Sequence, residues 1–224
     1  MGEILEMTVR RVLAAVATAL VLTGCGQQYE ESRAVVQGVL QGLVPGRAEA
    51  GAPPRPQFSR AALEEAGVDF VLASVPQRGV AALLQKAGSN GPEETWIAED
   101  GVSVTYERGF VVATRGLGPD LMAANVTAVR AAVRQGGGTA VRVHEYLDGN
   151  DQIVRHDYTC RITRLGAEAV EIYERRYATT RYQETCERGG QTFENTYWID
   201  QAGVVWKSRQ LISPPVGYLD SEKL

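Results

Sequence analysis

The chain has 224 residues, of which 44% are hydrophobic and 22% charged, so it is long enough for one well-filled core and short for two. Lysine and arginine number 23 against 27 aspartate and glutamate, which gives a net charge of −4. This balance argues against intrinsic disorder and against electrostatic binding to DNA, RNA or anionic lipid, so no nucleic-acid partner is expected.

The first 24 residues have the pattern of an export signal. Arg10 and Arg11 precede an apolar run at residues 12–22 that only Thr18 interrupts. These 11 positions suit a signal-peptide core, whereas a membrane-spanning helix needs about 20 residues. The acidic stretch at residues 2–6 suits such a signal poorly, and we therefore expect translation to begin at Met7 rather than Met1.

The apolar run ends in Leu22-Thr23-Gly24-Cys25, which resembles the lipobox of bacterial lipoprotein precursors. In such precursors the cysteine receives a diacylglycerol, the chain is cut before it, and the new amino terminus is acylated, for example with palmitate. Three acyl chains anchor a protein far more firmly than one. The resemblance predicts lipidation at Cys25, and the alternative is an exported soluble protein with an incidental cysteine. Gly26 stands where an aspartate would retain a lipoprotein in the inner membrane, which implies the periplasmic face of the outer membrane.

Residues 25–57 are predicted to form a lipidated N-terminus, a peripheral helix and a connector. Apolar side chains recur at helical spacing within residues 28–43, and residues 45–56 hold four of the nine prolines. A single β-rich domain is expected over residues 58–224. Ser59 can cap a short helix through Ala66, which Gly67 is suited to end.

Beyond residue 68 the apolar residues alternate with a period of two, which predicts β-strands. The expected strands are 68–75, 79–87, 94–99, 102–107, 110–115, 139–147, 152–164, 168–178, 181–187, 191–199 and 203–212. One inserted helix is expected over residues 120–135, ended by the glycines at 136–138. So many close-spaced strands with so few crossovers indicate an antiparallel meander that must close, curl or be covered at its edges.

Cys160 and Cys186 remain once Cys25 is assigned to lipidation. In an oxidising periplasm this pair indicates one disulfide, with two free thiols as the alternative. Turns at 166–167 and 179–180 would place both cysteines opposite Tyr173 and about 9–10 Å apart, beyond the limit of about 7 Å between Cα atoms. A bridge therefore requires a different strand pairing, such as one long strand from Glu168 onward or a loop that folds back.

No motif for catalysis or metal binding is present. The sequence lacks HExxH, CxxC, GxSxG and a phosphate-binding loop, so no catalytic residue, metal or cofactor is predicted, and a polysaccharide hydrolase is a distant alternative. His144 and His156 lie on the arms of one predicted hairpin. A two- or four-residue turn would place them on opposite faces, and a three-residue turn on the same face.

The tryptophans are better candidates for recognition. A two-residue turn at Asp100-Gly101 would pair Trp96 with Thr105, on the face away from the main core, where an indole could stack on a sugar or a partner. Packing in a second core layer is the alternative. Trp206 flanks the turn at residues 200–203, where core packing is again the alternative to binding.

Several short segments carry a family resemblance. They are Thr95-Trp96, Asp100-Gly101-Val102, Gly109-Phe110, Thr114-Arg115-Gly116-Leu117-Gly118 with Asp120-Leu121, and Trp206-Lys207-Ser208-Arg209-Gln210. Together they resemble the group 4 capsule polysaccharide lipoprotein family, also called YjbF-type. The similarity runs from about Ser59 to Ser213, and the segment at 114–121 is its most specific part. It implies a deformed β-barrel or half-barrel and a non-enzymatic association with exopolysaccharide or capsule production. Cys160 and Cys186 lie outside the recognised pattern.

The resemblance and the anchor together predict an accessory in exopolysaccharide export or assembly, with the membrane, polysaccharide and other export proteins as partners. The alternative is a carrier or chaperone for an apolar ligand such as a lipid or lipoprotein, because a curled sheet can enclose a cavity. A large apolar pocket would favour the carrier, and a groove with Trp96 and polar residues would favour glycan or protein contact. The candidate binding residues are Trp96, Arg115, Asp120, Trp206 and Arg209.

Arg115 and Asp120 are expected to have a structural role before any role in binding. They flank a tight passage from strand to helix, where Asp120 would lie in the first helical turn and pair with Arg115. The functional alternative is that Arg115 and Trp96 together present a guanidinium and a ring to an acidic sugar or a partner carboxylate.

Overall fold

The computed structural model describes residues 56–224. The predicted signal peptide, Cys25, the helix at 28–43 and nearly all of the connector lie outside the described residues. Within residues 56–224 no helix is long and apolar enough to cross a membrane.

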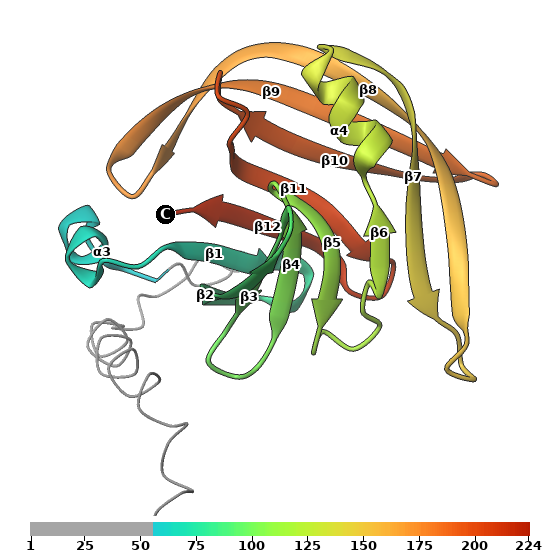
Figure 1. Ribbon diagram of the computed structural model, residues 1–224, viewed down its shortest axis with the longest axis horizontal. Coiled ribbons are helices and arrows are strands. Elements are labelled where there is room, and N and C mark those ends of the chain that lie inside the picture. The colour runs from blue at the N-terminus through green and yellow to red at the C-terminus, as the bar shows by residue number, and fades with distance from the viewer. Residues whose placement is uncertain (1–55) are drawn as a thin grey trace, which may run out of the picture. The chain divides into compact units, whose positions relative to one another are not determined.

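The described residues form two short helices and twelve strands (Figure 1). The helices are α3 (Arg60–Ala66) and α4 (Thr127–Arg134), and Pro76–Arg78 form a 3₁₀ turn, η1. The strands are β1 (Phe70–Val75), β2 (Val80–Asn90), β3 (Glu93–Ile97), β4 (Ser103–Glu107), β5 (Phe110–Arg115), β6 (Ala123–Asn125), β7 (Gly137–Leu147), β8 (Ile153–Ile172), β9 (Arg175–Arg188), β10 (Gln191–Ile199), β11 (Val205–Ser213) and β12 (Gly217–Lys223).

All twelve strands belong to one antiparallel sheet in the order β5-β4-β3-β2-β1-β12-β11-β10-β9-β8-β7-β6. Every neighbouring pair is consecutive in the chain except β1 and β12, so the chain meanders away from β1 in one direction and returns to it through β12. The sheet curls until its edge strands β5 and β6 lie side by side (Figure 1). The prediction of a mainly β, antiparallel, barrel-like meander is confirmed.

The helices follow from their caps and their apolar faces. Ser59 accepts a hydrogen bond from the amide of Ala62, and Gly67 ends α3 in a left-handed conformation with φ 63°, as predicted. The second helix is shorter than the predicted 120–135. Residues 123–125 pair with β7 as strand β6 instead, and α4 begins only at Thr127.

Two apolar clusters fill the curl of the sheet. The first joins β1–β4 to β11 and β12 and includes Val71, Leu84, Trp96, Val104 and Leu219. The second packs α4 against β7–β10 and includes Val129, Val133, Tyr158, Ile162 and Tyr197. Neighbouring residues of β5 contribute to both clusters, Val111 to the first and Phe110 and Val112 to the second. Both faces of this edge strand are therefore buried.

The pairing of β8 with β9 corrects the predicted turns. Strand β8 runs unbroken from Ile153 to Ile172, with a bulge between Arg164 and Gly166 where a turn was predicted. The turn lies at Tyr173 and Glu174, both of which have positive φ. Strands β6 and β12 were not predicted.

Candidate functional site

A pocket of about 240 Å³ opens between β1, β3 and β4 on one side and β11 and β12 on the other. It reaches the surface beside the β4–β5 turn and the β10–β11 turn. Its lining includes Trp96, Tyr106, Arg108, Trp206, Ser208 and Ser221, and it is called the Trp96 pocket. Trp96 and Trp206, both predicted as binding candidates, thus line the same pocket.

Trp96 occupies the wall of this pocket and not an outer face. It pairs with Val104, is 3% exposed, and packs in the core with Tyr106. The predicted pairing with Thr105 was wrong because the turn contains three residues, 99–101. Ala98 donates its amide to the carbonyl of Val102 at 2.8 Å, and a turn longer by one residue moves each side chain to the other face.

Trp206 is held at the pocket by two contacts. Its ring stacks on Tyr177 with the centroids 3.7 Å apart, and its Nε1 donates to the carboxylate of Asp200 at 2.8 Å. It sits where β11 bulges against β10, because Trp198 pairs with Lys207 and Ile199 pairs with Val205. The bulge re-aims the indole toward the pocket.

Buried hydroxyl groups add polar character to the pocket. The hydroxyls of Tyr106 and Ser221 lie 2.7 Å apart, and Ser208 accepts a hydrogen bond from Nε2 of Gln210 at 2.9 Å. Burial raises the pKa of Tyr106, although the bond to Ser221 opposes this, so the phenol stays neutral. These residues lie on β4, β11 and β12, and sequence reasoning missed them. Side chains along β4 alternate between the two faces of the sheet, and the inward position of Tyr106 in this pattern was the one local signal for these residues.

The pocket therefore combines aromatic walls with neutral hydroxyls, and its charged residues are Glu94, Arg108, Lys207 and Lys223. Aromatic faces pack on the apolar faces of sugar rings, and hydroxyls exchange hydrogen bonds with sugar hydroxyls. At about 240 Å³ the pocket is smaller than the roughly 300–1,000 Å³ of sites for drug-sized ligands. This size and polarity favour a single sugar ring over a lipid cargo.

Arg115 and Asp120 lie where the two edges of the sheet meet, apart from the Trp96 pocket. Asp120 precedes β6 rather than opening a helix, and among residues 56–224 no ion pair joins it to Arg115. Its carboxylate accepts hydrogen bonds from the amides of Gly116 and Leu117 at 2.9 and 3.1 Å. Arg115 donates to backbone carbonyls, those of Thr114, Leu121 and Met122. Both side chains are bonded to the backbone of this segment, by contacts other than the predicted pair.

Arg209 makes a local ion pair with Asp220. One guanidinium nitrogen donates to both carboxylate oxygens at 3.0 and 3.1 Å, and the group lies over the ring of Tyr218. Arg209 and Asp220 face each other in the pairing of β11 with β12. These contacts give the residue a structural role, and it does not line the Trp96 pocket.

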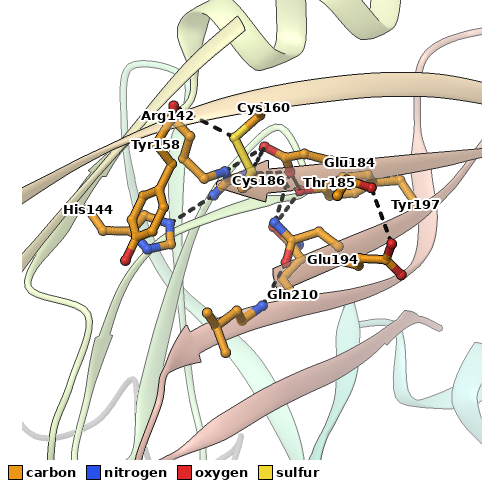
Figure 2. Close-up of a disulfide and its surroundings, with 12 residues drawn as sticks. Arg142, His144, Tyr158, Cys160, Glu184, Thr185, Cys186, Glu194, Tyr197 and Gln210 are labelled. Atoms are coloured by element: carbon orange, nitrogen blue, oxygen red, sulfur yellow. Dashed lines mark hydrogen bonds and ion pairs between the residues drawn. A yellow bond between two sulfur atoms is a disulfide. The ribbon is translucent and has the colours of Figure 1, made fainter. Parts of the chain in front are cut away.

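A buried polar network fills the curl next to the disulfide (Figure 2). Arg142 donates to both oxygens of Glu184, at 2.8 and 3.1 Å, and to the hydroxyl of Tyr197 at 2.9 Å. Burial acts to lower the pKa of Arg142, but the Glu184 carboxylate outweighs it and holds the pKa above its usual value. Asn195 also donates to Glu184, so the carboxylate is well satisfied.

His144 belongs to the same network. It pairs directly with His156 because the hairpin turn has three residues, which is the alternative that places both on one face. Burial, with the charge of Arg142, holds the pKa of His144 well below its usual 6.5. The neutral ring accepts from Arg142 at Nε2 and donates from Nδ1 to Tyr146, whose hydroxyl donates to the carbonyl of Ile212.

Cys160 and Cys186 face each other in the β8–β9 pairing and form a disulfide, with their Cα atoms 4.0 Å apart. The predicted bond is thus confirmed, through a different pairing from the one with turns at 166–167 and 179–180. Together with Glu184 the two sulfurs form a compact cluster. The disulfide consumes both thiolates that a metal ion would need, so this cluster does not suit one.

Comparisons with known proteins agree with the fold and the family resemblance. The family model described as "Group 4 capsule polysaccharide lipoprotein gfcB, YjbF" matches residues 29–224. The crystal structure of the hypothetical lipoprotein YmcC from Escherichia coli K12 superposes with a TM-score of 0.61 and 16% identity, covering 76% of this chain and 97% of that one. At this identity the likeness concerns the fold alone. The comparison with curated proteins found no match.

Proposed function

Because the chain belongs to the group 4 capsule polysaccharide lipoprotein family, we propose that it serves, without catalysis, as an accessory in exopolysaccharide or capsule export or assembly. A lipoprotein family implies a lipid anchor and a place in the cell envelope. The proposal goes further and assigns the periplasmic face of the outer membrane, with Cys25 as the lipidated residue.

The observation that carries this proposal is the pocket with Trp96 and Trp206 in its walls and the Tyr106–Ser221 hydroxyl pair inside it. In a family named for a capsule polysaccharide, such a pocket suits one sugar residue of a longer chain. The carrier alternative calls for a larger and more apolar cavity than this one.

The role is tested by deleting the gene while leaving its neighbours intact, and measuring the amount and chain length of secreted polysaccharide. We expect less polysaccharide or a changed length distribution, restored by the wild-type gene. Unchanged amount and length would overturn the proposed role.

The pocket is tested by complementation with a Tyr106→Phe/Ser221→Ala variant. Removing both partners of one hydrogen bond leaves no unpaired group, so the fold should persist while the polar character of the pocket is reduced. The matched control is Thr95→Val/Thr105→Val, which removes a hydroxyl pair, 3.1 Å apart, that joins β3 to β4 and does not line the pocket. We expect only the control to restore secretion. Full restoration by both variants would remove the pocket from the proposal.

The anchor is tested with Cys25→Ser, which should block lipidation and release the protein from membranes or stop its processing. A variant of mature size that still fractionates with the outer membrane would contradict lipidation at Cys25. Wild-type protein that fractionates with the inner membrane would contradict the outer-membrane assignment.

A further inference from the structure

A second hollow, the arginine groove, lies next to the Trp96 pocket. It has a volume of about 850 Å³ and runs between α4, β8–β9 and the turns β4–β5 and β10–β11. Arg108, Ala202 and Gly203 line both hollows. The rest of the groove is lined by arginines, two carboxylates and apolar side chains.

The groove is cationic although the chain has a net charge of −4. Four arginines line it, at positions 108, 130, 134 and 164, against two carboxylates. Both carboxylates are already engaged: Glu107 forms an ion pair with Arg130, and Asp200 accepts from the indole of Trp206. Four guanidinium groups against two carboxylates leave the lining with an excess of two positive charges.

The side chains of Arg108, Arg134 and Arg164 are exposed, and within residues 56–224 none of these three guanidinium groups forms a hydrogen bond or an ion pair. They come from three separate elements, the β4–β5 turn, the end of α4 and strand β8. Burial, and after it the nearby charge of Arg134, lower the pKa of Arg130. Each free guanidinium offers a planar pair of donors that matches a carboxylate.

Apolar side chains line the groove between the arginines. Phe110, Val133, Tyr182 and Ile199 are buried or half-buried there, and Phe110 is fixed against Tyr197 with the ring centroids 4.5 Å apart. An apolar surface flanked by guanidinium groups suits a ring that is apolar on its face and anionic at its edge. An acidic sugar has this character.

The β4–β5 turn makes a close contact with the first residue of β11, at the wall of the Trp96 pocket. Gly109 has φ 89°, and a Cβ atom added to it would lie only 2.5 Å from Cβ of Val205. The β4–β5 turn therefore touches β11 so closely that no larger residue fits. Arg108, next to this contact, lines both hollows.

We propose that the arginine groove binds an acidic glycan through its carboxylates, with neighbouring sugars of the same chain reaching the Trp96 pocket past Arg108. The biological identity of this glycan, the exported polysaccharide, rests on the proposed function. The binding chemistry itself rests only on the groove.

Binding is measured by titration calorimetry on the full-length lipidated protein in a neutral detergent. The probe is a galacturonic acid oligomer, with a neutral galactose oligomer of equal length for comparison. We expect the acidic oligomer alone to bind, and more weakly as salt is raised. The Arg134→Gln/Arg164→Gln variant should lose about tenfold or more in affinity, since each charged hydrogen bond counts for roughly that factor.

The matched control is Arg161→Gln/Arg176→Gln, which removes the same charge from two exposed arginines that do not line the groove. It should bind like the wild type. Equal losses of affinity in both variants, or no binding of the acidic oligomer by folded wild-type protein, would overturn the proposal that the groove binds an acidic glycan. So would binding only of short-chain phosphatidylglycerol, which would assign these arginines to a lipid phosphate.

The two proposals fail separately. Normal secretion in the deletion strain, together with groove-dependent binding in the calorimeter, would refute the proposed function and leave the groove intact. Altered secretion in the deletion strain with no oligomer binding would support the proposed function and refute glycan binding in the groove.

Discussion

The carboxylate of Asp120 accepts a 2.7 Å hydrogen bond from the hydroxyl of Thr114, and this contact joins the two edges of the sheet. Thr114 lies on edge strand β5, and Asp120 lies in the segment that leads into edge strand β6. The same hydroxyl accepts the amide of Leu121, and the amide of Thr114 donates to the carbonyl of Leu121. The most specific segment of the family resemblance, residues 114–121, is therefore the closure of the barrel.

Replacing Asp120 with Ala should destabilise the fold by about 3 kcal/mol, because two amides and one hydroxyl lose a charged acceptor. Urea unfolding measures this loss. The control is Asp157→Ala, which removes an exposed ion pair with Arg155 and should cost less than about 1 kcal/mol. Similar small losses in both variants would show that the closure contributes little.

Arg115→Ala separates the structural from the binding interpretation of this residue. Its guanidinium donates to three backbone carbonyls at the closure, so we expect a lower melting temperature. Secreted polysaccharide should fall only as far as the amount of folded protein falls. An unchanged melting temperature with lost secretion would instead assign Arg115 to ligand binding.

The buried ion pair between Arg142 and Glu184 should be costly to break from one side. Glu184→Gln leaves the Arg142 charge uncompensated, and we expect a loss of about 3–5 kcal/mol in the free energy of unfolding. Replacing both residues, as Arg142→Met/Glu184→Leu, should cost less because no buried charge remains. A double variant that is less stable than Glu184→Gln would contradict this account.

The buried His144 and the half-buried His156 predict a loss of stability in mild acid. His144 and His156 both have a pKa lowered mainly by burial, whereas in the unfolded chain they titrate near 6.5. Below that pH the unfolded state binds more protons, so the free energy of unfolding should fall from pH 7 to pH 5.5. The slope is at most about 1.4 kcal/mol per pH unit for each histidine.

Chemical unfolding across this range measures the slope, and His144→Gln is the informative variant. The amide can still accept from Arg142, but it does not titrate, so the slope should become smaller while a remainder from His156 persists. An equal slope in the variant and the wild type would assign the acid sensitivity to other groups.

The positions of most strands could be predicted because alternation and glycine turns are local signals. Register was harder, since one additional residue in the turn at 99–101 moved Trp96 from an expected outer face into the core. Strand β6 has three residues, and it pairs with β7 while the adjoining segment is fixed by contacts to β5, so its own sequence carries little signal.

The candidate site was predictable only in part. Trp96 and Trp206 were identified singly, as rare aromatic residues near turns. Their meeting with Tyr106 and Ser221 depends on β1 pairing with β12 at opposite ends of the chain, which no local pattern encodes. The arginines of the groove lie on separate elements for the same reason, and each one alone is typical of a solvated surface.

The disulfide should stabilise the protein without being needed for its fold. It links Cys160 to Cys186 across 26 residues, and the chain-entropy estimate for such a loop is about 3 kcal/mol. The bonded residues already face each other in a long hairpin, and neighbouring pairs such as Ile162 with Glu184 hold the register without the bond. A Cys160→Ala/Cys186→Ala variant should therefore fold, with a lower urea midpoint and the strand-rich circular dichroism spectrum of the wild type.

Both sulfurs are fully buried, so reductant should reach them only on unfolding and lower the wild-type midpoint toward that of the variant. The variant, with no disulfide left, serves as the control and should not respond to reductant. A wild-type midpoint that is the same with and without reductant, in protein whose disulfide is reduced on unfolding, would show that the bond adds no stability.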